Sequence, residues 1–206
     1  MKPSSLAGLA LLAALPAHAA PVLLDFEAVT SFASIDRFYD GGRDSAGARG
    51  PSLGARFTPG AIGLRNDAAG PYFSNAPSPI GVMAPVESIA TLDVAEGFRG
   101  LFGFFYSSSE AIANAVQVWS GENGRGALLA SFSLAANATL GCTSSPYCRF
   151  DALSATIGET ARSVTFGRAA NVAAFDNVSF NTVPLPAPAA LLALGAVGLI
   201  ASRRRG

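Results

Sequence analysis

Lysine and histidine are almost absent from this 206-residue chain, and the chemistry that depends on them is absent too. Lys2 is the only lysine and His18 the only histidine, so residues 20–206 contain neither. A Ser-His-Asp triad and a Cys-His pair need a histidine, and a Schiff base needs a lysine. We therefore assign no catalytic residue, and we expect no histidine-bearing zinc site.

Charged residues are scarce as well, at 14% of the chain, and they balance to a formal net charge of zero. Without Lys2 and the three terminal arginines Arg203, Arg204 and Arg205, the 14 basic residues fall to 10 against 14 acidic ones, a formal charge of −4. Nucleic-acid binding depends on a basic surface that neutralises phosphates. The composition therefore argues against nucleic acid as a partner.

Only two cysteines are present, Cys142 and Cys148, in the segment GCTSSPYC. Two cysteines without a histidine or further cysteines cannot complete a tetrahedral zinc shell. In an exported protein, a pair this close is typical of a disulfide that fixes a loop. We predict a Cys142–Cys148 disulfide.

Residues 1–19 have the order of a secretory signal peptide. Lys2 gives a basic start, Leu6–Leu15 an apolar stretch, and Ala17 and Ala19 the small residues of an A-x-A cleavage site. A membrane-spanning helix needs about 20 apolar residues, so this stretch is too short to be one. We predict that it is removed on export through the inner membrane.

An uncharged apolar run from Ala187 to Ala201 lies near the other end, and the cluster of Arg203, Arg204 and Arg205 follows it. About fifteen helical residues rise roughly 22 Å, less than a hydrocarbon core of about 30 Å, although flanking side chains extend the reach. The positive-inside rule places the arginines in the cytoplasm. We predict a transmembrane helix over about 187–202; the alternative is a buried helix of a soluble domain.

A short motif precedes that run. Val183, Pro184, Leu185, Pro186 and Ala187 spell VPLPA, and the apolar run and the arginine cluster complete a three-part order. Residues 183–206 thus resemble the VPLPA variant of the PEP-CTERM sorting signal of Gram-negative bacteria. The resemblance implies cleavage near the motif by an exosortase-type membrane protease, followed by transfer to the cell surface or release. It also implies an association with exopolysaccharide and biofilm.

Residues 20–182 are expected to form one domain, since about 160 residues can enclose a core. Long helical periodicity is missing, whereas short apolar stretches alternate with Gly-rich turns. The strongest strand pattern is 98–106, where Phe98, Phe102, Phe104 and Tyr106 share one face. Further strands are expected over 22–27, 56–58, 61–64, 88–94, 115–119, 127–134, 147–151, 163–168 and 172–180. The predicted fold is an all-β, antiparallel β-sandwich.

The opening segment DFE (25–27) and the closing segment AFDNVSF (174–180) resemble the terminal strands of jelly-roll domains. Such domains occur in carbohydrate-binding modules and in many PEP-CTERM surface proteins. The resemblance implies a jelly-roll-like sandwich in which the first and last strands lie side by side.

That pairing would bring Asp25, Glu27 and Asp176 to one sheet edge. Calcium takes several oxygen ligands at about 2.4 Å, and in the resembled carbohydrate modules this part of the fold holds a structural calcium. The three carboxylates are therefore candidate calcium ligands, and no other cofactor is expected. The alternative is that they are ordinary solvent-facing edge charges.

Sugar binding needs aromatic faces for stacking and polar groups for the hydroxyls. Tyr39, Tyr72 and Phe73 lie in expected loops and are the candidate glycan-binding residues. Asn66, Asp67 and Asn75 lie close by in the sequence and could supply the polar groups. Trp119, the only tryptophan, ends an expected strand and is equally well explained as a core residue.

The sequence thus predicts a surface-directed, non-catalytic protein that associates with extracellular polysaccharide. Two alternatives stay open. A purely structural surface protein would bind no sugar. A glycosidase needs only two carboxylates about 5 to 9 Å apart, but among 14 acidic residues some such pair is always available.

Overall fold

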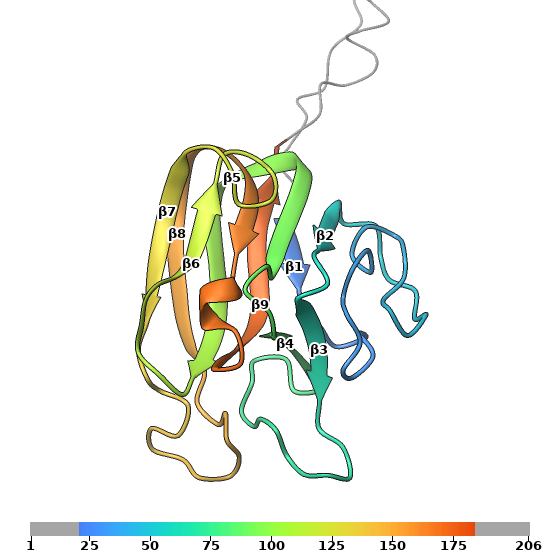
Figure 1. Ribbon diagram of the computed structural model, residues 1–206, viewed down its shortest axis with the longest axis vertical. Coiled ribbons are helices and arrows are strands. Elements are labelled where there is room, and N and C mark those ends of the chain that lie inside the picture. Colours follow the sequence, from blue (N-terminus) through green and yellow to red (C-terminus); the bar gives the residue numbers. More distant parts are fainter. Residues whose placement is uncertain (1–20, 184–206) are drawn as a thin grey trace, which may run out of the picture. The chain divides into compact units, whose positions relative to one another are not determined.

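The computed structural model describes residues 21–183, which form nine β-strands and one short 3-10 helix (Figure 1). In chain order they are β1 (Pro21–Leu24), β2 (Ala55–Phe57), β3 (Ala61–Arg65), β4 (Gly81–Pro85), β5 (Thr91–Ser108), β6 (Ile112–Trp119), β7 (Leu128–Leu134), β8 (Asp151–Thr165), η1 (Gly167–Ala169) and β9 (Ala173–Thr182). All the strand pairings are antiparallel. The predicted all-β, antiparallel class is confirmed.

Both terminal signals fall outside this range, apart from Val183, the first residue of the VPLPA motif. The predicted signal peptide lies outside the described residues. So do the rest of the motif and the membrane helix expected over 187–202, together with the arginines predicted to be cytoplasmic, Arg203, Arg204 and Arg205. Between residues 21 and 183, no helix has the length and apolar character needed to cross a bilayer. The sorting signal therefore stays a prediction.

The two longest strands, β5 and β8, take part in both layers of the sandwich (Figure 1). Residues 91–94 of β5 lie between β2 and the end of β8, and β6 and β7 continue that layer. In the other layer, residues 98–108 of β5 lie between β9 and the first part of β8. β9 pairs in turn with β1 and with β4, and β4 pairs with β3. The β5–β8 register shifts between Asp93 and Gly100, where the strands pass from one layer to the other.

Gly97 makes this bend possible. Its φ is +79°, and a Cβ atom there would lie 2.5 Å from Thr160 Cγ2 and 2.9 Å from the Ala161 carbonyl oxygen. A residue with a side chain would therefore be both strained and obstructed. The Gly97 carbonyl also accepts the Val183 N–H at 3.1 Å, which ties the end of the described chain to the bend.

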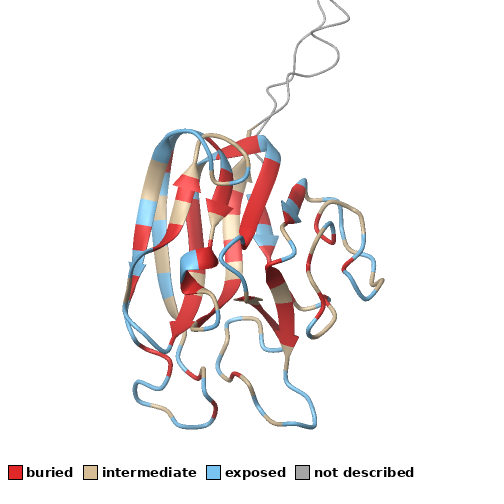
Figure 2. Ribbon diagram, in the orientation of Figure 1, coloured by how far each residue is buried: buried red, intermediate tan, exposed pale blue. Residues whose placement is uncertain are grey.

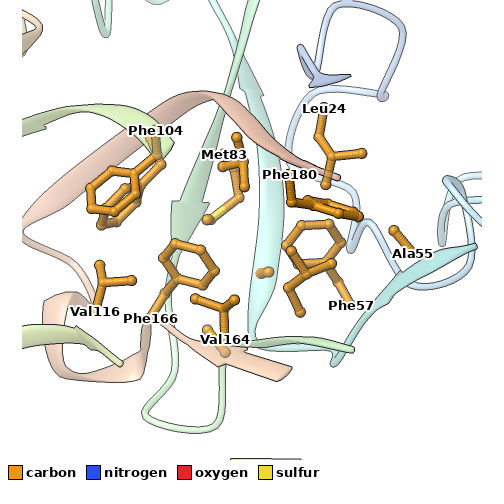
Figure 3. Close-up of a cluster of buried hydrophobic side chains, with 14 of the residues drawn as sticks. Leu24, Ala55, Phe57, Met83, Phe104, Val116, Val164, Phe166 and Phe180 are labelled. Atoms are coloured by element: carbon orange, nitrogen blue, oxygen red, sulfur yellow. The ribbon is translucent and has the colours of Figure 1, made fainter. Parts of the chain in front are cut away.

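Aromatic side chains fill the space between the layers. The Phe104 ring lies 5.2 Å from that of Phe132 in β7 and 5.6 Å from that of Phe175 in β9. Because β5 and β7 are not hydrogen-bonded neighbours, the first contact joins the two layers. Figure 3 shows the cluster, to which Met83 and Phe166 also contribute. The predicted inward face of 98–106 is confirmed, since its four aromatic residues are all buried: Phe98, Phe102, Phe104 and Tyr106.

A smaller apolar cluster lies outside the sandwich core, and two loops cover it. Its buried members are Leu64, Phe73, Val82 and Ala174. The loops 66–80 and 135–150 lie side by side at one end of the sandwich (Figure 1), where the Ser74 and Ser144 hydroxyls are 2.6 Å apart and the Asn75 amide donates to the Cys148 carbonyl at 2.9 Å. The Cys142–Cys148 disulfide, which closes part of the second loop, is confirmed.

Several expected strand boundaries are wrong. The strand expected over 22–27 ends at Leu24, and the one expected over 88–94 begins at Thr91. Ile89, within that expected strand, lies in a turn closed by a hydrogen bond from the Ala90 N–H to the Glu87 carbonyl, and it is exposed. The strands expected at 147–151 and 163–168 overlap the single strand β8 only at Asp151 and at residues 163–165. Most of β8 was therefore not expected, and β4 was not expected at all.

The central role of Phe104 can be tested by truncation. Phe104 is 2% exposed, so Phe104→Ala should lower the free energy of unfolding by about 3–5 kcal/mol through lost contacts and the cavity left behind. Urea unfolding of both proteins measures this. Leu101→Ala, at a position 57% exposed on the same strand, is the control and should stay within about 0.5 kcal/mol. Equal losses in the two variants would contradict the assignment of Phe104 to the core.

Candidate functional site

The pairing of the first and last strands brings the three candidate calcium ligands into one neighbourhood. β1 pairs with β9 from Pro21 opposite Asn181 to Leu24 opposite Val178, as predicted. Asp25 and Glu27 follow β1 directly and therefore pass close to Asp176 of β9. We call these three carboxylates the acidic cluster.

Asp25 and Glu27 do not, however, continue the strand. Phe26 between them has a φ of +58°, and its ring is buried in the core, 5.8 Å from the ring of Tyr39. Burial of this ring turns the chain out of the extended conformation. The strand expected over 22–27 therefore does not extend over 25–27, although the neighbourhood of the carboxylates is as expected.

Backbone N–H groups hold each carboxylate of the acidic cluster. Asp176 accepts the Ser78 N–H on Oδ2 and the Asn177 N–H on Oδ1, both at 2.7 Å. Glu27 Oε1 accepts the N–H groups of Ile80 and Gly81, both at 2.8 Å, and Asp25 Oδ1 accepts the Glu27 N–H at 3.3 Å. The cluster thereby connects residues 25–27, the end of the 66–80 loop and β9.

Asp176 is fully buried, which excludes for this residue the alternative of a solvent-facing edge charge. Burial, together with the negative charges of Glu27 and Asp25, raises the pKa of its carboxyl to about 7, although the Ser78 and Asn177 N–H groups act in the opposite direction. Burial likewise raises the pKa of the Tyr39 phenol, against the effect of the Phe26 N–H that it accepts at 2.7 Å. The negative charge in this neighbourhood is thus poorly compensated.

The donor set is of the kind that calcium prefers, but its geometry is not that of a formed site. In residues 21–183, no carboxylate of the cluster pairs with an arginine. Within the same range, no three Asp, Glu, His or Cys side chains are grouped so that they could hold a metal ion. The oxygen chemistry fits a hard cation, and calcium binding stays a prediction.

Two of the three candidate glycan-binding residues are buried. Tyr39 is 2% exposed and lies in the core, and Phe73 is 1% exposed and belongs to the smaller apolar cluster. The expectation that their rings are exposed is therefore wrong. The reason is that the long loops carry buried side chains of their own, as the buried positions between β1 and β2 show in Figure 2.

Tyr72 is half-buried, packed against the smaller apolar cluster, and it has an exposed aromatic neighbour that the sequence did not single out. The Phe32 ring lies 5.5 Å from the Tyr72 ring at 90°, and Phe32 is 56% exposed. The Tyr72 hydroxyl donates to Asp67, 3.1 Å from Oδ1. No strand was expected between residues 27 and 56, and the only sequence signal for Phe32 was an aromatic residue after two polar ones, Thr30 and Ser31.

Two hollows lie elsewhere on the described surface, and no predicted site residue lines either of them. One, of about 330 Å³, lies between the 86–90 turn and the 120–126 turn and is lined largely by hydroxyl groups, among them Thr58 and Thr165. The other, of about 310 Å³, lies beside the disulfide loop, against Asn137 and Leu140. Trp119 lies next to the first hollow, where its indole N–H donates to Thr165 Oγ1 at 3.2 Å.

Known proteins resemble this chain only distantly. No model of a protein family matches it, and no curated protein does. Among solved structures, the K2 cleaved adhesin domain of Lys-gingipain is similar, with a TM-score of 0.47 and 12% identity, over 78% of this chain and 99% of that one. A likeness this distant carries no argument about function.

The buried Asp176 predicts a dependence of stability on pH. Its pKa is about 7 in the folded protein and about 3.9 in an unfolded chain, so the folded state binds more protons between these values. The free energy of unfolding should therefore fall as pH rises from about 4 to about 7 and then level off.

Urea unfolding of the wild type and of Asp176→Asn across this range measures the effect. The variant should lack the fall in stability. It should also be less stable than the wild type at pH 5, because the Ser78 and Asn177 N–H groups donate to different oxygens of Asp176, and asparagine has a donor NH2 in place of one of them. Parallel pH profiles for the two proteins would contradict the assignment to Asp176.

Proposed function

We propose that this protein is exported, sorted to the cell surface and associated there with extracellular polysaccharide, without catalytic activity of its own. The observation that carries the proposal is the pair of terminal signals: the A-x-A cleavage site at Ala17 and Ala19, and the VPLPA motif with its apolar run and arginine cluster. An exosortase-type membrane protease is the partner that this order implies.

The position of the motif relative to the fold supports this proposal. β9 ends at Thr182, and the VPLPA motif begins at the next residue. Cleavage within residues 183–187 would therefore leave every strand of the sandwich intact. A disulfide-bonded sandwich also suits an extracellular location, because disulfides persist in oxidising compartments.

The glycan part of the proposal draws on the surface of the sandwich. The pairing of β1 with β9 agrees with a jelly-roll-like arrangement, and Tyr72 is the one of the three predicted aromatic residues that is only half-buried. Residues 20–206 contain neither histidine nor lysine, which favours binding over catalysis. A carboxylate-based glycan hydrolase is the alternative, and it would release reducing ends from the polymer.

Calcium belongs to the same proposal, as a structural ion at the acidic cluster. The buried Asp176 and its negative neighbours would be stabilised by a cation, and Asp25 Oδ2 and Glu27 Oε2 accept no hydrogen bond from the described part of the chain. Small movements of these side chains would be needed to gather the oxygens around an ion.

Sorting can be tested by removing the signal. Deletion of residues 183–206, or of the host's exosortase, should change where the protein accumulates, because the motif is the feature that the protease recognises. Immunoblots of membrane, cell-surface and medium fractions measure this. An unchanged distribution in both strains would refute the sorting proposal.

Polysaccharide association can be tested with the exported protein purified from its producing organism. It should be retained on a column of that organism's extracellular polysaccharide in calcium, and a chelator should weaken the retention if calcium holds residues 25–27 in place. Release of reducing ends, measured in the same fractions, would favour the hydrolase instead. A folded protein that passes unretained in both buffers would favour the purely structural alternative.

A further inference from the structure

Phe32 occupies a turn position that does not suit a bulky side chain. Residues 30–33 form a β-turn in which the Ala33 N–H donates to the Thr30 carbonyl at 3.1 Å, and Phe32, the third residue, has a φ of +60°. A positive φ at this position favours glycine or asparagine. A phenylalanine there is held in a strained conformation.

Backbone hydrogen bonds on both sides of the turn hold Phe32 in this conformation. Its N–H donates to the Gly63 carbonyl at 2.8 Å, and the Gly63 N–H donates to the Ala33 carbonyl at 3.0 Å. The Thr30 N–H donates to Asp44 Oδ2 at 2.9 Å. The turn also lies directly on β3, since a Cβ atom on Gly63 would be 2.6 Å from Val29 Cγ1.

The strained conformation of Phe32 does not place its ring in the core. Nine other phenylalanines are fully buried, whereas Phe32 is 56% exposed and its ring contact is with Tyr72. Tyr72 is itself held in place: its N–H donates to Asn66 Oδ1 at 2.8 Å, and its hydroxyl donates to Asp67. The result is an exposed Phe32 ring set edge-to-face against the half-buried Tyr72 ring, beside a carboxylate. We call this group the aromatic platform (Phe32, Tyr72 and Asp67).

We infer that the aromatic platform is the surface on which this protein binds a neutral pyranose unit of an extracellular polysaccharide; this inference rests on the proposed function. The C–H face of a pyranose ring packs on an aromatic face, and a carboxylate accepts hydrogen bonds from its hydroxyls. Asp67 accepts the Tyr72 hydroxyl and the Ala69 N–H and has lone pairs left for a sugar.

The charge of the domain selects against acidic polymers. Between Pro21 and Val183 there are 10 arginines and 14 acidic residues, and Asp67 adds its negative charge at the platform itself. A uronic acid or a sulfated sugar would be repelled there. Strain at Phe32 also fits a binding role, because glycine or asparagine would relieve it but would supply no ring.

Phe32→Asn separates binding from folding. Asparagine tolerates a positive φ, so the variant should unfold at the same temperature as the wild type or higher, while it loses a stacking ring. We expect retention of the exported, host-processed protein on the deproteinised host polysaccharide, and on a neutral β-glucan, to weaken about tenfold or more. Tyr72→Ala should weaken it too.

Leu101→Thr is the matched control, because Leu101 is 57% exposed and lies on β5, outside the platform. It should bind like the wild type. Phe32→Gly serves as a second variant with an unstrained turn, so that loss of binding in both can be assigned to the ring.

The outcomes separate the inference from the proposed function. If the wild type is retained and Phe32→Asn and Phe32→Gly are retained equally well, the platform is overturned and the polysaccharide association stands. If the wild type is not retained on the deproteinised polymer, both the aromatic platform and the polysaccharide association are refuted. Retention that is seen only before protein is removed from the polymer would point to a protein partner. Equal binding to polygalacturonate would overturn the assignment to neutral sugars.

Discussion

The arrangement around β9 is the constraint on which the rest of the structure depends. One edge of β9 pairs with the second part of β5, and the other edge pairs with β1 and β4. Without this strand, the layer of β3 and β4 would have no connection to β5, and the core aromatics Phe175 and Phe180 would be missing. The acidic cluster depends on the same pairing, since Asp176 lies in β9 and residues 25–27 follow β1.

The same strand explains why a carboxylate is buried in a domain with few charges. Asn177, with a φ of +47°, interrupts the regular pairing with β5 directly after Asp176, and the register shifts between Gly103 and Phe105 on the partner strand. A bulge of this kind re-aims a neighbouring side chain. Here the Asp176 carboxylate accepts the Ser78 N–H, so the 66–80 loop is fixed to the sheet at the expense of an uncompensated charge.

Strong local patterns made part of this fold predictable. The alternation of aromatics from Phe98 to Tyr106 identified the central strand, and the terminal segments identified the β1–β9 neighbourhood. β4 was missed because the segment GVMAP has no alternation and contains both glycine and proline. β8 was predicted as two separate short strands because its residues are largely small and polar, so buried and exposed positions differ little in hydropathy.

The burial of Tyr39 and Phe73 depends on how long loops pack on the sheet, and the position of Phe32 depends on a backbone conformation that its residue type disfavours. Local sequence patterns encode neither.

The pairing of Pro21 with Asn181 has a consequence for the timing of folding. β1, the first strand to be synthesised, pairs only with β9 among the described strands, and β9 is the last. A contact between residues this far apart in sequence closes a loop of nearly the whole domain, and such contacts form late. The sandwich therefore cannot be completed before its last residues are available, so neither end of the described chain can adopt its final pairing without the other.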